Sequence, residues 1–189
     1  MRYFGLKEKI RGNIFSLIDV LHHFPDEKPT AIKTQLSRFL KKGLIFQIKR
    51  GLYCFDKENI DELILANKLY QPSYISLETA LNYYGIIPDI PQEITSVTPI
   101  TTKLIKTSLG RFSYTKIKRE LFFGFKKIKS TKSKEYFQLA YPEKALLDYF
   151  YLRKIKNAAD LRLDLKNIDI NRYQKFLKSY PAWVAKIKL

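Results

Sequence analysis

Seven polar side chains share one face of segment 30–42 and could bind nucleic acid. The apolar residues Ile32, Leu36 and Phe39 recur at helical spacing, which predicts an amphipathic helix that buries these three side chains. The opposite face and its flanks then carry hydroxyl groups and cations, the groups that bind base edges and phosphates. The candidate DNA-binding residues of this helix are therefore Thr30, Lys33, Thr34, Ser37, Arg38, Lys41 and Lys42.

A predicted β-hairpin directly after this helix adds three candidate residues. Its two short strand-like runs, LIFQI and LYCF, are joined through Lys49, Arg50 and Gly51, where glycine permits a tight turn. Cations at such a tip can contact phosphates or the adjacent minor groove. We therefore expect Lys49, Arg50 and Gly51 to extend the DNA-binding surface.

Local helix signals predict how these two elements are positioned. Ser16 followed by Asp19 is a capping-box-like start of a short helix, which we expect to end before Pro25. The longer helix should begin near residues 29–30, and Gly43 should end it in the left-handed conformation. The segment LKEKIR further upstream is expected to form another short helix.

The order of these features favours DNA binding over a surface that is merely solvated. An exposed basic helix face or a cationic hairpin tip is common by itself. Here a capped helix, a second helix with outward cations, a glycine stop and a cationic hairpin follow one another between residues 15 and 55. This order is typical of a winged helix-turn-helix, in which one helix enters the major groove and a β-wing lies on the flanking backbone.

The charge of the chain also favours a nucleic-acid partner. The chain has 35 Lys and Arg residues against 18 Asp and Glu residues, a formal net charge of +17. Such a surplus favours polyanions through counterion release. Residues 1–58 contribute +6 and residues 59–189 contribute +11, so the predicted reading module is not the most basic part. Codon usage in an AT-rich genome is a competing source of some lysines.

Segment 103–134 is the most basic stretch, with 11 basic residues and Glu120 as its single acid. Its aromatic residues alternate with lysines, which would permit RNA binding on a stacking platform. Core packing explains Phe112, Phe122 and Phe125 equally well. We expect this segment to form a secondary basic patch from Lys103, Lys106, Arg111, Lys116, Lys118, Arg119, Lys126, Lys127 and Lys129.

The residue inventory argues against an enzyme. His22 and His23 are the only histidines, they are adjacent, and no set of Cys and His ligands accompanies them. The chain has no G-x-S-x-G, no Walker loop and no H-E-x-x-H motif. It also lacks a Gly-Ser followed by an Asp-x-Asp pair, which two-metal nucleotidyl transfer would use. We therefore expect no catalytic residues, no metal and no cofactor.

Composition and spacing predict two domains, a winged helix-turn-helix over residues 1–58 and an α+β domain over residues 59–189. The polar run DKEN would join them, and Asn59 with Glu62 would open the next helix. No stretch approaches a membrane span or a secretory leader. The single cysteine, Cys54, excludes an intrachain disulfide and fits a reduced, cytoplasmic setting. In a wing strand it should be half-buried.

The second domain should combine helices with an antiparallel sheet. Ser76 can cap the helix LETALNYYG, and Pro142 can open the helix PEKALLDYFYLRKI, with further helices near the C-terminus. Glu143, Lys144 and Asp148 would lie on the more polar side of that helix and could form intrahelical pairs. Four strand-like runs lie between these helices, and their sequential order suggests antiparallel pairing: ITSVTPIT, RFSYTKI, LFFGFKKI and EYFQLA.

Motifs along most of the chain resemble the AbiEi family. PSYIS and PEKALLD are much more specific than the winged-helix pattern, which many unrelated regulators share. The resemblance spans residues 15 to about 152. The matching runs are RGLY, QPSYISLETALNYYGIIP, ITSVT, GRFSY and AYPEKALLDYFYL.

That resemblance implies an antitoxin and transcriptional regulator of a type IV toxin–antitoxin system, which acts in abortive infection and phage defence. The N-terminal winged helix would repress its own operon, and its partner would be double-stranded operator DNA, expected to contain inverted repeats. The C-terminal domain would counter a nucleotidyltransferase-like toxin encoded beside it. An antitoxin that acts mainly by direct contact with the toxin remains the alternative.

Overall fold

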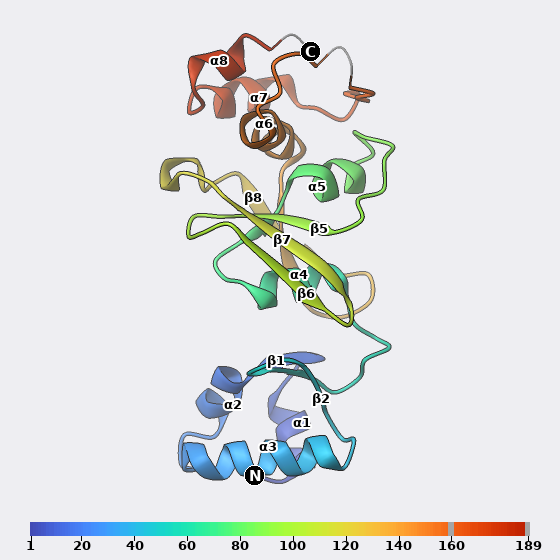
Figure 1. The fold of residues 1–189 in the computed structure, drawn as a ribbon, viewed down its shortest axis with the longest axis vertical. Helices are drawn as coiled ribbons and strands as arrows, with labels where there is room; N and C mark the ends of the chain where they lie inside the picture. Colours follow the sequence, from blue (N-terminus) through green and yellow to red (C-terminus); the bar gives the residue numbers. More distant parts are fainter. Residues whose placement is uncertain (159–160, 188–189) are drawn as a thin grey trace.

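A computed structural model describes residues 1–158 and 161–187 of the chain. It is a mixed α+β structure whose N-terminal part (residues 1–58) and C-terminal part (residues 59–187, as far as described) are stacked along the long axis (Figure 1). The α+β class predicted from the sequence is therefore confirmed. Among the described residues, no helix is long and apolar enough to cross a membrane.

The N-terminal part contains three helices and a small antiparallel sheet of order β1-β3-β2. The predicted helices and both hairpin strands are present, whereas β1 was not predicted. The elements are α1 (Tyr3–Lys9), β1 (Ile14–Ser16), α2 (Leu17–His23), α3 (Pro29–Lys41), β2 (Phe46–Lys49) and β3 (Leu52–Cys54).

Local chemistry explains where these helices begin and end. The Ser16 hydroxyl accepts from the Asp19 backbone N–H, and the Asp19 carboxylate accepts from the Ser16 backbone N–H, so the predicted capping box is confirmed. Pro29 occupies the first turn of α3. Gly43 ends that helix at φ +66°, a left-handed conformation that glycine adopts without steric cost.

The C-terminal part is built on a six-stranded sheet of order β6-β7-β5-β4-β9-β8. Figure 1 shows α5 and α6 beyond the sheet, on the side away from the N-terminal part. The elements are α4 (Glu62–Leu69), β4 (Tyr74–Ile75), α5 (Leu77–Tyr83), β5 (Ile94–Thr98), β6 (Lys103–Thr107), β7 (Gly110–Lys116), the 3₁₀ turn η1 (Arg119–Leu121), β8 (Phe125–Lys129), β9 (Tyr136–Ala140), α6 (Pro142–Arg153), α7 (Ile170–Leu177) and α8 (Ala182–Ala185).

The prediction of an antiparallel sheet was wrong, because the sheet is mixed. β5 runs parallel to β7, and β4 runs parallel to β9. The chain crosses from β5 to the edge strand β6 and returns as β7, antiparallel to β6, which makes β7 parallel to β5. β6 was not predicted, and β4 was not counted among the four sequential strands, so the order of neighbours could not be deduced from sequential pairing.

Two predicted caps differ from the observed ones. Asp61, rather than Asn59, caps α4, and its carboxylate accepts from the backbone N–H groups of Leu63 and Ile64. Ser76 does precede α5, but its hydroxyl makes no cap bond and instead donates to the Asp148 carboxylate at 2.9 Å. A tertiary partner thus replaces the local bond that spacing suggested.

The helix α6 begins at Pro142 as predicted, but its charged residues are not on a polar side. Glu143, Lys144 and Asp148 are all buried, with side chains at most 1% exposed. Lys144 and Asp148 do form the expected intrahelical ion pair. The prediction of pairing is therefore confirmed, and the prediction of a polar face was wrong because helices also cover the outer side of α6.

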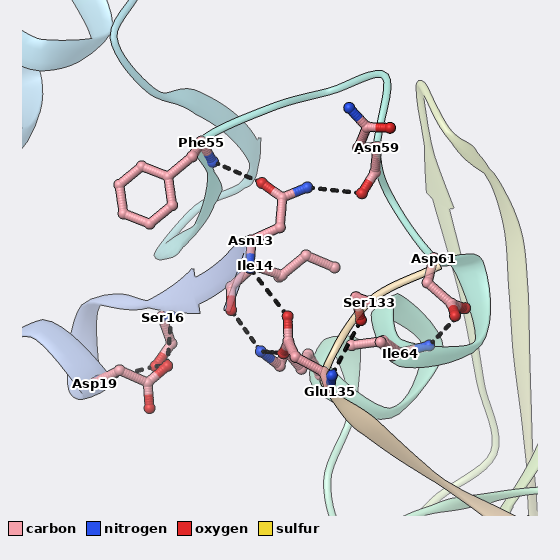
Figure 2. Close-up of polar contacts among 11 residues, drawn as sticks. Asn13, Ile14, Ser16, Asp19, Phe55, Asn59, Asp61, Ile64, Ser133 and Glu135 are labelled. Atoms are coloured by element: carbon pink, nitrogen blue, oxygen red, sulfur yellow. Dashed lines mark hydrogen bonds and ion pairs between the residues drawn. The ribbon is translucent and has the colours of Figure 1, made fainter. Parts of the chain in front are cut away.

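The joint between the two parts is both apolar and polar. Ile14, Leu52 and Cys54 belong to the large apolar cluster of the C-terminal part, whereas the N-terminal part has a smaller cluster of its own. Figure 2 shows Asn13 between the two parts, with its side-chain amide donating to the Asn59 carbonyl at 2.9 Å and its backbone N–H donating to Glu135 at 3.0 Å. The two parts on either side of the predicted boundary at residue 58 are therefore joined by apolar packing and by hydrogen bonds.

Candidate nucleic-acid interface

Helix α3 and its C-cap residue Lys42 present all seven predicted binding residues to solvent. The opposite face of the helix packs Ile32, Leu36 and Phe39 into the smaller apolar cluster. Figure 1 shows α3 along the end of the molecule farthest from the six-stranded sheet. The exposed residues are Thr30, Lys33, Thr34, Ser37, Arg38, Lys41 and Lys42.

The exposed face of α3 carries cations from Lys33 to the C-terminal end of the helix. Helix α3 contains no acidic residue, and Arg38 and Lys41 lie in its last turn, where they also interact favourably with the helix dipole. The Thr34 hydroxyl donates to the Thr30 carbonyl at 3.0 Å. That hydroxyl is therefore engaged within the helix, while the charged side chains remain open to a ligand.

The hairpin tip provides one exposed cation rather than two. Arg50 is exposed, and Gly51 has φ +79°, which fits the predicted turn. Lys49 is half-buried at the joint, where its Nζ donates to the Leu69 carbonyl. Burial and then repulsion from Lys103 lower the pKa of Lys49. The expectation of a free cation at position 49 does not match this placement, because a partner from the C-terminal part holds its side chain.

The predicted secondary basic patch is not one surface. Lys103 and Lys106 lie on β6, whereas Lys126, Lys127 and Lys129 lie on β8, and these two strands form opposite edges of the six-stranded sheet. These lysines are close in the sequence but lie on opposite edges of the sheet, so they do not form one patch. Arg111 and Lys116 are at the two ends of β7, and Lys118 and Arg119 lie beside and in η1.

Several cations of this segment already have partners within the chain. Nζ of Lys103 lies 5.2 Å from the Tyr70 ring centre, and that of Lys126 lies 5.0 Å from the ring centre of Tyr141. Ion pairs also join Arg111 to Glu93 at 3.5 Å and Lys118 to Glu120 at 3.7 Å. The two ion pairs offset part of the positive charge that the segment offers to a polyanion.

The aromatic residues of segment 103–134 pack inward. Phe112 is 1% exposed, and the rings of Phe122 and Phe125 lie 5.2 Å and 4.6 Å from that of Tyr74, which is fully buried. These contacts favour the core-packing explanation that the sequence left open. Phe112, Phe122 and Phe125 therefore do not form an exposed platform on which RNA bases could stack.

The histidines are not part of a metal site in the described residues. His22 and His23 are exposed neighbours at the end of α2. In residues 1–158 and 161–187, no group of three or more His, Cys, Asp or Glu side chains is placed to hold a metal ion. Cys54 is fully buried rather than half-buried, because β3 packs against the C-terminal part. Burial, followed by the nearby Asp56 carboxylate, raises the pKa of its thiol to about 11.

Sequence reasoning missed a buried polar cluster at the centre of the C-terminal part. Lys144 Nζ donates to the hydroxyls of Tyr74 at 2.9 Å and Tyr180 at 2.6 Å, and it pairs with Asp148. The hydroxyls of Tyr74 and Tyr180 donate to Asp148 at 2.9 Å and 2.6 Å. The motifs PSYIS and PEKALLD thus meet in space and bond to each other, which explains why polar residues recur in otherwise apolar runs.

No protein-family model matches the chain, and no curated protein matches it either.

Proposed function

We propose that this protein is a DNA-binding transcriptional regulator, with residues 1–58 acting as a winged helix-turn-helix. The observation that carries the proposal is the acid-free, cationic outer face of α3 next to the β2–β3 hairpin. A helix of this kind fits the major groove, and its Arg and hydroxyl side chains can bind base edges while lysines bind phosphates. Arg50 at the hairpin tip would contact the flanking backbone.

We further propose, from the resemblance to the AbiEi family, that the protein is the antitoxin of a type IV toxin–antitoxin system. In this proposal it represses its own operon, and its C-terminal part counters a nucleotidyltransferase-like toxin. The alternative within this class is neutralisation mainly by direct contact with the toxin. Growth of cells that express the neighbouring toxin gene, with and without this protein, tests the antitoxin proposal. Co-purification of the two proteins would favour direct contact.

Binding to duplex DNA from upstream of its own gene tests the regulatory proposal. We expect clear preference for this duplex over a shuffled duplex of the same composition, and an affinity that falls steeply with salt because phosphate contacts release counterions. Equal affinity for the two duplexes across the salt range would contradict sequence-specific regulation. The shuffled duplex is the matched control for general attraction to a protein of net charge +17.

A further inference from the structure

Helices α6 and α8 of the C-terminal part lie at the opposite end of the molecule from α3 (Figure 1), and a second candidate binding site lies beside them. It is a cavity of about 600 Å³ between the end of β7, the end of α6 and α8. A cavity of this size is in the range of small-molecule sites. Its lining includes four lysines and two large aromatic residues, drawn from three segments far apart in sequence: Lys116, Lys118, Tyr151, Lys154, Lys156 and Trp183.

Two aromatic rings line this cavity, and contacts with other rings hold them in place. The rings of Tyr151 and Trp183 are stacked, with centres 6.1 Å apart and planes at 28°. Tyr151 also meets the Tyr180 ring edge-on at 5.8 Å. The Tyr180 hydroxyl is in turn bonded to buried Lys144 and Asp148. The buried polar cluster therefore fixes this aromatic surface from behind, while Trp183 remains 38% exposed.

The lining of the cavity is also rich in lysines. Its four lysines are all exposed, and no acidic residue is among the described residues that line it. Glu120 lies beyond the lining and is 3.7 Å from Lys118 Nζ. Exposed lysines that share one lining attract an anion. The cavity thus pairs a stacking surface with sites for negative charge.

We propose that this cavity binds a nucleotide, either free or as one unit of a single-stranded nucleic acid. The base would stack on the aromatic surface of Trp183 and Tyr151, as bases do on aromatic side chains in single-strand-binding proteins. The phosphates would lie among Lys116, Lys118, Lys154 and Lys156. An acidic peptide without aromatic residues would satisfy the lysines but would leave the two rings without a stacking partner. This site does not depend on DNA binding by α3.

Trp183 is the only tryptophan of the chain, so the tryptophan fluorescence of the unmodified protein comes from this cavity alone. We expect AMP and ATP to quench its fluorescence saturably, because a stacked base contacts the indole. Inorganic tripolyphosphate, which has the charge but no base, should bind much more weakly and cause little quenching. A short oligothymidylate that binds at least tenfold more tightly than TMP would assign the site to a strand. Similar affinities would assign it to free nucleotides.

Matched substitutions separate this site from general attraction. We expect the pair Lys116→Gln and Lys156→Gln to weaken ATP binding by about tenfold or more, since two cations next to the phosphates are lost. The pair Lys106→Gln and Lys127→Gln removes the same charge from the two sheet edges and should change binding less than twofold. Trp183→Ala, followed by calorimetry, should weaken binding by about tenfold through lost stacking.

Three results would overturn the proposal. They are the absence of saturable quenching by AMP, ATP and the oligothymidylate, equal weakening by the two lysine pairs, and binding of tripolyphosphate as tight as that of ATP. The lysine variants keep the test valid if Trp183→Ala unfolds, because all four of those side chains are exposed. Thermal melting of each variant checks that it is folded.

Discussion

Single side chains in this protein divide into those whose surroundings are local and those whose partners come from distant segments. The outward direction of Arg38 and Lys41 follows from helical spacing alone, because Leu36 and Phe39 must face the core. Lys49 could not be placed in this way, since its partner is the Leu69 carbonyl of the C-terminal part. The cavity lysines likewise come from β7 and from the end of α6, so no spacing rule unites them.

The buried Lys144–Asp148 pair provides a prediction at this scale. Lys144→Met should destabilise the protein by about 3–5 kcal/mol, because it leaves the Asp148 carboxylate buried without its cation. The double variant Lys144→Met and Asp148→Asn removes the carboxylate charge but keeps an acceptor for the buried hydroxyls of Tyr74 and Tyr180, so it should recover part of this loss. Urea unfolding of the three proteins measures the effect. A double variant no more stable than Lys144→Met would contradict the assignment of the loss to an unpaired charge.

Cys54 provides a second prediction, about pH. Its folded pKa, about 11, lies above the ordinary value of 9.0. A raised folded pKa means that the contribution of the neutral thiol is fully present below pH 9 and is lost as the pH rises from 9 through 11. The stability advantage of the natural protein over Cys54→Ala should therefore shrink across that range. A pH-independent difference between the two unfolding free energies would contradict the buried, protonated thiol.

Helices and strands were predictable to the extent that their signals are local. Capping boxes, first-turn prolines and a glycine stop located α2, α3 and α6 from the sequence. The strand β6 escaped because an edge strand needs little apolar surface, and Leu104 on it is 48% exposed. The parallel pairing of β4 with β9 joins segments more than sixty residues apart in the sequence. No local turn signal could therefore predict this pairing.

The hairpin provides a prediction at the scale of an element. Arg50→Ala should reduce the slope of log affinity against log salt by about one unit, because one phosphate contact is lost. Lys49→Ala should leave the slope unchanged and instead lower thermal stability, because its Nζ bonds to the joint rather than to solvent. Salt titrations of both variants on operator duplex make the comparison. An equal loss of slope in both variants would mean that Lys49 also contacts a phosphate, which would contradict this assignment.

At the scale of the whole molecule, the two parts share a joint rather than a bare linker. The carboxylate of Glu135 accepts from the Asn13 backbone N–H and pairs with Lys68, which also donates to the Ile14 carbonyl. A Cβ added at Gly12 would lie 2.4 Å from Glu135. A side chain at position 12 would therefore displace the Glu135 carboxylate, which would break its bonds across the joint.

Two glycine substitutions test this joint. Gly12→Ala should lower the melting temperature, since the Glu135 side chain must move and give up its bonds across the joint. Gly5→Ala is the matched control, because a Cβ there meets nothing within 4 Å, and alanine in α1 should stabilise by about 0.5–1 kcal/mol. Calorimetric melting measures both. Stabilisation by Gly12→Ala would show that the close approach does not constrain the molecule.

The ratio of affinities for operator and shuffled duplex, measured for the Arg38→Ala variant, tests the central claim most directly. We predict that operator binding weakens by about 1–3 kcal/mol and that the ratio narrows, because Arg38 on the outer face of α3 would read base edges. Lys41→Ala should weaken both duplexes more evenly. Arg119→Ala removes the same side chain from the C-terminal part and should leave the ratio unchanged. An unchanged ratio in Arg38→Ala, or an equal loss in Arg119→Ala, would contradict sequence reading by the outer face of α3.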